Sequence, residues 1–190
     1  PSRAPKGKVA QLMTFGATVI SVQGSYEETF ELSKQAIDRW GWYNRNAAIN
    51  PYLSEGKKTV AYEIAEQLDW QMPDFIAISV GDGCTIAGLW KGLKDLHAVG
   101  LIDRLPRLIS AQAEGCCPIN RAIAENRPWE PMEENTLADS IAVGVPRNAD
   151  KALMAIRESN GIVVNVTDEE IMAAQKLLGT TCGVFGEPAG

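Results

Sequence analysis

One uninterrupted apolar run constrains the fold most: residues 74–80, Asp-Phe-Ile-Ala-Ile-Ser-Val, lead directly into the glycine-rich stretch Gly-Asp-Gly-Cys-Thr at residues 81–85. Such a run is typical of a parallel strand that is buried on both faces of its sheet. From about residue 86 to residue 99 the apolar residues follow the spacing of a helix. A strand, a glycine turn and a helix in this order indicate a parallel α/β sheet.

Other segments repeat this alternation. Residues 107–113 and 162–166 are predicted strands, and helices are expected to follow them from about Pro118 and from Asp168 to about Leu178, where Thr167 is the N-cap. Two more strands are predicted at residues 17–22 and, weakly, at 46–50, where Pro51 ends the run. The remaining predicted helices cover residues 8–13, 25–40, 57–68 and 148–158. The polar residues 127–137 are expected to form an exposed connection.

The best domain boundary lies near Asn46. Residues before it hold one helix–strand–helix unit, which has too few elements to close a core, whereas four or five strands are expected after it. We therefore predict a partial small domain at residues 1–46 and a large, incomplete domain at residues 47–190. The expected fold class is α/β, with a parallel sheet in a three-layer αβα arrangement. Because the chain also begins without methionine, we expect it to be an internal piece of a longer protein.

Composition excludes several classes of function. The 18 Lys and Arg residues against 24 Asp and Glu residues give a net charge of −6, which argues against binding to nucleic acid or to an anionic membrane. No apolar run approaches the length of a membrane span, so a soluble, cytoplasmic protein is expected. A single histidine, His97, rules out histidine clusters within the chain, and the four cysteines form no Cys-x-x-Cys pair. We therefore expect no metal site.

The glycine turn is the strongest candidate site. Gly81 and Gly83 allow backbone N–H groups to point into the turn, the following helix adds its positive N-terminus, and Thr85 adds a hydroxyl. This arrangement suits a phosphate group, although an ordinary strand-to-helix connection explains the same residues equally well. Neither a G-x-G-x-x-G nor a Walker sequence is present, which disfavours dinucleotides and nucleoside triphosphates. Asp82 should point away from an anion, and Cys84 is interpreted as a small residue in a tight turn rather than as an activated thiol.

Five stretches together carry a resemblance to a known family. They are Ala4–Ala17, Asn50–Thr59, Val80–Gly92, Gly100–Gly115 and Glu187–Gly190, with Ala-Pro-Lys-Gly-Lys-Val-Ala-Gln, Asn-Pro-Tyr, Glu-Gly-Lys-Lys-Thr, Gly-Asp-Gly-Cys-Thr, Gln-Ala-Glu-Gly and Glu-Pro-Ala-Gly as their motifs. In these motifs, which are spread along nearly the whole chain, the sequence resembles threonine synthase and its relatives among the fold type II pyridoxal-phosphate enzymes.

The resemblance implies a small domain packed on a larger one, with pyridoxal 5'-phosphate in the cleft between them. Threonine synthases convert O-phosphohomoserine and water to threonine and phosphate. In this family the loop that matches Gly81–Thr85 holds the cofactor phosphate, so Gly81, Asp82, Gly83, Cys84 and Thr85 are the implied cofactor-binding residues. Asp82 and Cys84 depart from a family loop that is often richer in Gly and Asn. The segment that matches Glu187–Gly190 runs close to the cofactor.

Three functional parts of the family have no match in this sequence, and one of them is the Ser or Thr that faces the pyridine nitrogen of the cofactor. The lysine that holds the cofactor lies in a Ser-Phe-Lys-Asp segment, and the substrate carboxylate is held by a Ser-x-Gly-Asn loop; neither occurs here. We therefore nominate no catalytic residue and expect residues 1–190 alone to be inactive. The resemblance leaves open a related enzyme of the cysteate synthase or ammonia-lyase type, each with a small amino-acid substrate. A non-catalytic phosphate-binding or assembly domain and a homo-oligomer also stay open.

Overall fold

A computed structural model describes all residues from 1 to 190, which divide into two compact units, Pro1–Asn44 and Arg45–Gly190. The division lies close to the boundary predicted near Asn46. The assignment of these units as parts of a small and a large domain stays a prediction. No helix in the structure has the length and apolar character needed to cross a bilayer.

The first unit contains two helices, α1 (Lys6–Thr14) and α2 (Tyr26–Trp40). Helix α2 begins with the predicted capping box, in which the Ser25 side chain accepts from the Glu28 amide and Glu28 accepts from the Ser25 amide. The strand predicted at residues 17–22 is wrong: these residues join no sheet, and one backbone hydrogen bond, from the Ser2 amide to the Val22 carbonyl oxygen, connects them to the start of the chain. Their composition favours an extended backbone, but a strand needs a partner to complete its hydrogen bonds.

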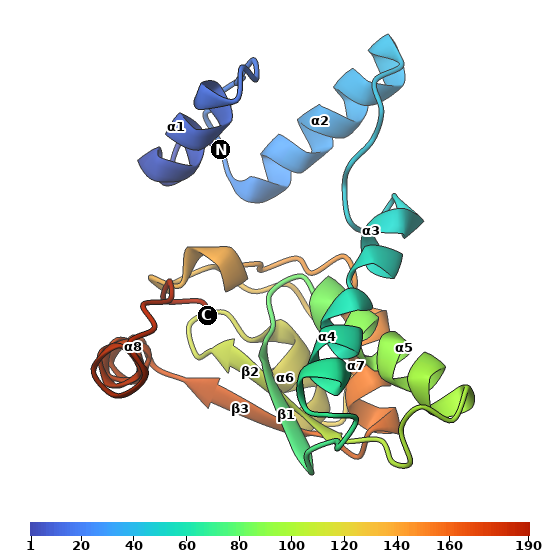
Figure 1. The fold of residues 1–190 in the computed structure, drawn as a ribbon. Helices are drawn as coiled ribbons and strands as arrows, with labels where there is room; N and C mark the ends of the chain where they lie inside the picture. The colour runs from blue at the N-terminus through green and yellow to red at the C-terminus, as the bar shows by residue number, and fades with distance from the viewer. The chain divides into compact units, whose positions relative to one another are not determined.

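The second unit is built on a three-stranded parallel sheet in the order β1 (Phe75–Ser79), β2 (Arg107–Ala113) and β3 (Ile162–Val166) (Figure 1). The predicted α/β fold with a parallel sheet is confirmed. The helices of this unit are α3 (Pro51–Gly56), α4 (Thr59–Gln67), α5 (Cys84–Ala98), α6 (Pro118–Ala124), α7 (Ala149–Glu158) and α8 (Asp168–Cys182), and a short 3-10 helix spans Asp139–Ile141.

The sheet has fewer strands than predicted, because residues 46–50 form a turn instead of a strand. The amides of Ile49 and Asn50 both donate to the Asn46 carbonyl oxygen, at 3.0 and 2.9 Å. The Asn50 side chain then accepts from the Tyr52 amide and caps α3, a helix that the sequence analysis missed. An asparagine followed by proline is a helix-start signal that was available in the sequence.

The two faces of the sheet are covered unequally. One face packs into the main core with α5, α6 and α7, and its apolar side chains are Ile76, Ile78, Leu108 and Val163. On the other face Phe75, Ile162 and Val164 remain 44, 40 and 41% exposed. Helix α8 covers only the carboxyl end of this second face, where Ile171 packs in one cluster with Ala113 and Val166. In Figure 1, α8 accordingly lies on the opposite side of the sheet from α5 and α7.

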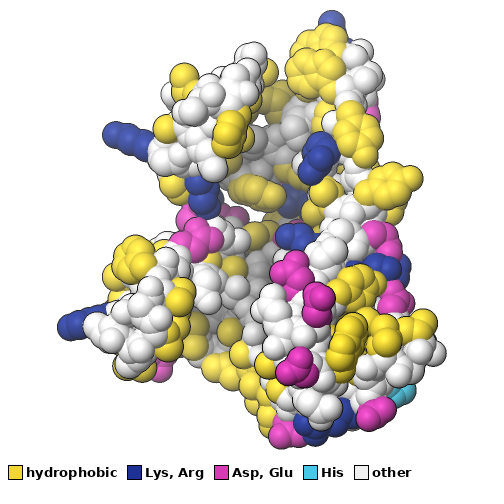
Figure 2. Space-filling model, viewed as in Figure 1, with side chains coloured by type: hydrophobic (Ala, Val, Ile, Leu, Met, Phe, Trp, Pro, Cys, Tyr) yellow, Lys and Arg dark blue, Asp and Glu magenta, His cyan; other side chains and the backbone are white.

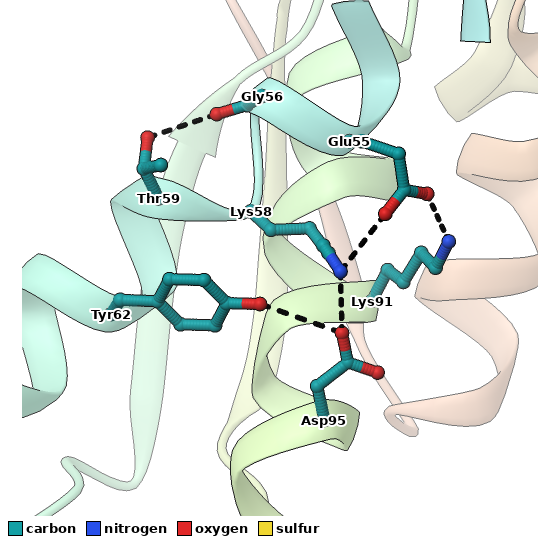
Figure 3. A network of polar contacts seen from close by, with 7 residues as sticks. All are labelled: Glu55, Gly56, Lys58, Thr59, Tyr62, Lys91 and Asp95. Atoms are coloured by element: carbon teal, nitrogen blue, oxygen red, sulfur yellow. Dashed lines mark hydrogen bonds and ion pairs between the residues drawn. The ribbon is translucent and has the colours of Figure 1, made fainter. Parts of the chain in front are cut away.

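A charged network ties α3 and α4 to α5 (Figure 3). The Lys58 ammonium donates to Asp95 at 2.7 Å and pairs with Glu55 at 2.9 Å. Glu55 also accepts from Lys91, and the Tyr62 hydroxyl donates to Asp95 at 3.4 Å. The hydrogen bonds from Lys91 and Lys58 hold the pKa of the Glu55 carboxyl below its usual range, and those to Asp95 and Glu55 raise the pKa of Lys58. Glu55 and Lys58 are therefore both charged at neutral pH.

This network predicts a contribution of Glu55 to acid stability. Because the pKa of Glu55 is lowered in the folded state, its stabilising contribution is complete above the ordinary value of 4.5 and is lost as the pH falls below it. We expect the free energy of unfolding of Glu55→Gln to depend less steeply on pH than that of the wild type below about pH 5. Urea unfolding at a series of pH values measures the difference. Glu133→Gln, at an exposed carboxylate without an ion pair, is the control and should keep the wild-type slope; equal slopes for all three proteins would contradict the prediction.

Candidate functional site

The predicted turn connects β1 to α5 at the carboxyl edge of the sheet. Val80, which is 2% exposed, extends the strand pairing by donating to the Ala111 carbonyl oxygen at 2.8 Å. Gly83 has a φ of +88°, and a Cβ placed there would lie 2.9 Å from the Asn148 carbonyl oxygen. At Gly81 a Cβ would lie 2.9 Å from the Ile141 Cα. Both positions therefore require glycine, one for its backbone conformation and for space, the other for space alone.

The amides of this turn have no acceptor within the chain. None of the N–H groups of Gly81–Thr85 donates a hydrogen bond to another residue, and α5 has no side-chain cap. The Cys84 side chain is buried, with its Sγ 3.6 Å from the Ser54 Oγ, and Thr85 is half-buried in the first turn of the helix. A run of unpaired amides at a helix N-terminus is a favourable environment for an anion. The residues present thus fit a phosphate group.

Asp82 is directed at the start of α7 instead. Its Oδ1 accepts from the Arg147 amide at 2.7 Å, and its Oδ2 accepts from the Asn148 Nδ2 at 2.5 Å. The Asp82 carbonyl oxygen also accepts from the Asn148 amide at 3.1 Å. The side chain is therefore engaged by residues more than sixty positions further along the sequence.

Sequence reasoning missed a buried polar group beneath the turn. The Gln112 Nε2 donates to the Val80 carbonyl oxygen at 3.0 Å, and its Oε1 accepts from the Asn120 amide at 2.8 Å. Asn120 in turn accepts from the Ser110 hydroxyl at 2.6 Å, and Ser110, Gln112 and Asn120 are all fully buried. The alternation of Ser110 and Gln112 with apolar residues in a predicted buried strand was an available signal, because buried polar side chains need partners.

The adjacent thiols on the β2 side of this edge are not activated. Burial raises the pKa of Cys116 to about 11, and burial also raises the pKa of Cys117. Both side chains are buried. They stay protonated at neutral pH and supply no nucleophile. No group of three His, Cys, Asp or Glu side chains is arranged to hold a metal ion.

An apolar pocket of about 580 Å³ adjoins the same edge of the sheet. Ser79 at the end of β1, Ile141 and the segment from Glu187 to Gly190 line it together with α8. Figure 2 shows hydrophobic side chains along the hollow beside α8. Ala189 is buried here with Ala113 and Ile141. The structure thus places Glu187–Gly190 on the pocket that borders the end of β1, the strand that leads into the turn.

Comparison with known proteins gives a consistent result along the whole chain. The family described as pyridoxal-phosphate dependent enzyme matches residues 1–190. The threonine synthase of Methanosarcina acetivorans is 45% identical over 185 residues, and that of Methanocaldococcus jannaschii is 43% identical over 187 residues. Each alignment covers 96% of this chain but only 45% of the relative, so the chain spans less than half the length of these relatives.

The fold of the chain also matches two solved structures of serine racemases. Serine racemase from Dictyostelium discoideum superposes with a TM-score of 0.75 at 25% identity, over 100% of this chain and 57% of that one. The maize serine racemase structure gives a TM-score of 0.80 at 24% identity, which shows the likeness of the fold alone.

Proposed function

This chain belongs to the pyridoxal-phosphate-dependent enzyme family, and we propose that its turn Gly81–Thr85 holds the phosphate of that cofactor. The observation that carries the proposal is the run of turn amides without an acceptor in the chain, at the N-terminus of α5. Backbone N–H groups there donate to phosphate oxygens, and the helix dipole favours the negative charge. When bound, pyridoxal phosphate supplies an electron sink for chemistry on an amino acid.

Each residue of the turn has its own part in this proposal. Gly81 and Gly83 keep the backbone free of Cβ atoms where Ile141 and Asn148 approach. Thr85 adds its hydroxyl as a further donor, and Cys84 contributes its amide while its thiol lies against Ser54. Asp82 contributes only backbone, because its carboxylate is held by the residues before α7.

For the whole protein we propose threonine synthase activity, the conversion of O-phosphohomoserine and water to threonine and phosphate. The two archaeal relatives support this substrate, being named threonine synthases and 43–45% identical over nearly the whole chain. No lysine of residues 1–190 lies in a motif that matches the lysine segment of the family, so we expect this part alone to bind phosphate without turnover.

An assay of the whole protein tests the substrate. In the presence of pyridoxal phosphate, we expect O-phosphohomoserine to yield threonine and inorganic phosphate in equal amounts. Release of ammonia from serine or threonine, without phosphate release from O-phosphohomoserine, would show an ammonia-lyase instead. Formation of cysteate from O-phosphoserine and sulfite would show the cysteate synthase type.

Calorimetry tests the site itself. Titration of residues 1–190 with inorganic phosphate and with pyridoxal phosphate should show weak binding of both, because both present the same anion to the turn. Binding that weakens as salt is raised would fit an anion held by amides and a helix dipole. No binding of either ligand would contradict the site and would favour an assembly domain.

A further inference from the structure

Two helices, α5 and α7, begin beside the turn, and they differ in the polar groups around their N-termini. Helix α5 follows Gly83 without a side-chain cap, and α7 follows Asn148, whose own side chain makes no capping bond. Instead, Asp82 accepts from the Arg147 amide and from the Asn148 side chain, and its carbonyl oxygen accepts from the Asn148 amide. A carboxylate at this end of a helix is also favoured by the helix dipole. The turn therefore supplies an anionic group just before the N-terminus of α7.

Close packing accompanies these hydrogen bonds. A Cβ on Gly83 would lie 2.9 Å from both the Asn148 carbonyl oxygen and the Ala152 Cβ, so the turn backbone rests on the first turn of α7. Asn148 is 2% exposed, and its Oδ1 is buried without a partner. Asp82 is thus the acceptor that fixes the orientation of this buried amide.

We propose that the Asp82 carboxylate is a positioning residue, which holds the phosphate turn in its binding conformation by joining it to the N-terminus of α7. The inference rests on the proposed phosphate site. It explains why a carboxylate is compatible with an anion-binding turn: two hydrogen bonds direct it at α7, and it acts on the ligand only through the backbone that it holds. A carboxylate that merely stood near the anion would repel it.

Removal of the Asp82 side chain distinguishes a positioning role from electrostatic repulsion, because the two predict opposite changes in phosphate affinity. We expect Asp82→Ala to bind inorganic phosphate about tenfold more weakly, because the loss of charge-assisted hydrogen bonds frees the turn. If the carboxylate acted by repulsion alone, the same substitution would tighten binding. Asp82→Asn should bind phosphate at least as tightly as the wild type. Its side-chain oxygen can still accept from the Arg147 amide. Its NH2 group can donate to the unpartnered Asn148 Oδ1 if the side-chain amide of Asn148 rotates by half a turn. Calorimetric titration with inorganic phosphate measures all three proteins.

The control substitution removes a carboxylate from α7 and leaves the hydrogen bonds of Asp82 to Arg147 and Asn148 intact. Asp150 is an exposed residue in the first turn of α7, and Asp150→Ala should leave phosphate affinity unchanged. If Asp82→Ala does not fold, Asn148→Ala decides, since it breaks only the side-chain bond and should also weaken binding. Unchanged or tighter binding in the informative alanine variant would overturn the positioning role. Failure of the wild type to bind phosphate would instead overturn the proposed site.

Discussion

Replacement of Gly83 by alanine should both destabilise the chain and weaken phosphate binding. A left-handed backbone costs an L residue about 1–2 kcal/mol. The new Cβ would also lie 2.9 Å from the Asn148 carbonyl oxygen and the Ala152 Cβ, and such overpacking costs about 1–3 kcal/mol more. The turn must shift to relieve this contact. If the shift removes one charge-assisted hydrogen bond to the anion, phosphate affinity falls by about tenfold or more. Urea unfolding and calorimetry with inorganic phosphate measure the two effects.

Gly100 provides a matched control after the other end of the same helix. Its φ is +75°, but nothing lies within 4 Å of the position of its Cβ. Gly100→Ala should therefore carry only the backbone cost of about 1–2 kcal/mol and should keep the wild-type phosphate affinity. If both variants lost phosphate affinity equally, general destabilisation would explain the loss and the turn would have no special part in binding.

The parts of the fold that the sequence could predict are those determined by local patterns. The strand at residues 74–80, the glycine turn and the helix after it were all predicted. An apolar run, a turn and a helical period each depend only on neighbouring residues. The capping boxes at Ser25 and Thr167 are local in the same way. Such features can be predicted from one sequence.

One error is local, at residues 46–50, where a helix-start signal was overlooked. The other errors and omissions of the sequence prediction concern contacts between distant segments. Residues 17–22 have the composition of a strand, but a strand also needs a partner, which composition does not supply. The role of Asp82 depends on Asn148, 66 positions later, and that of Gln112 depends on Val80, 32 positions earlier. A local pattern cannot show such a partner. It can show only that a buried polar side chain needs one.

The contacts of Gln112 and Asp82 both place a side-chain acceptor near a helix N-terminus at the carboxyl edge of the sheet. The Gln112 Oε1 accepts from the Asn120 amide in the first turn of α6, and the Asp82 carboxylate accepts from the Arg147 amide just before α7. At α5, by contrast, none of the amides from Gly81 to Thr85 has an acceptor within the protein. Because unpaired amides are costly when buried, the acceptor for α5 should come from outside the chain, from solvent or a bound anion.

The connection at residues 127–137 is held against this edge by close backbone contacts. Asn135 donates its amide to the Gly115 carbonyl oxygen at 3.1 Å, and a Cβ on Gly115 would overlap the Asn135 carbonyl oxygen. Two residues further on, the Leu137 amide donates to Asp168 Oδ2 at 3.0 Å, which links the same segment to the start of α8. The polar composition of the segment predicted a connection but not this contact.

We therefore expect Gly115→Ala to be strongly destabilising. Because the obstacle is a backbone carbonyl, it cannot be relieved by a change of rotamer, so the segment must move away. Overpacking of about 1–3 kcal/mol and the loss of a hydrogen bond worth about 0.5–1.5 kcal/mol give an expected loss of roughly 2–4 kcal/mol in the free energy of unfolding. Urea unfolding measures this loss.

Gly186→Ala is the matched control, since Gly186 also lies in a loop but has nothing within 4 Å of its Cβ position. Its stability should stay within about 1 kcal/mol of the wild type, because reduced freedom in the unfolded chain is the main effect. Equal stability of the two variants would mean that the segment around Asn135 is not packed on Gly115. A loss confined to Gly115→Ala would show that the glycine after Glu114, in the motif Gln-Ala-Glu-Gly, is needed for this backbone contact.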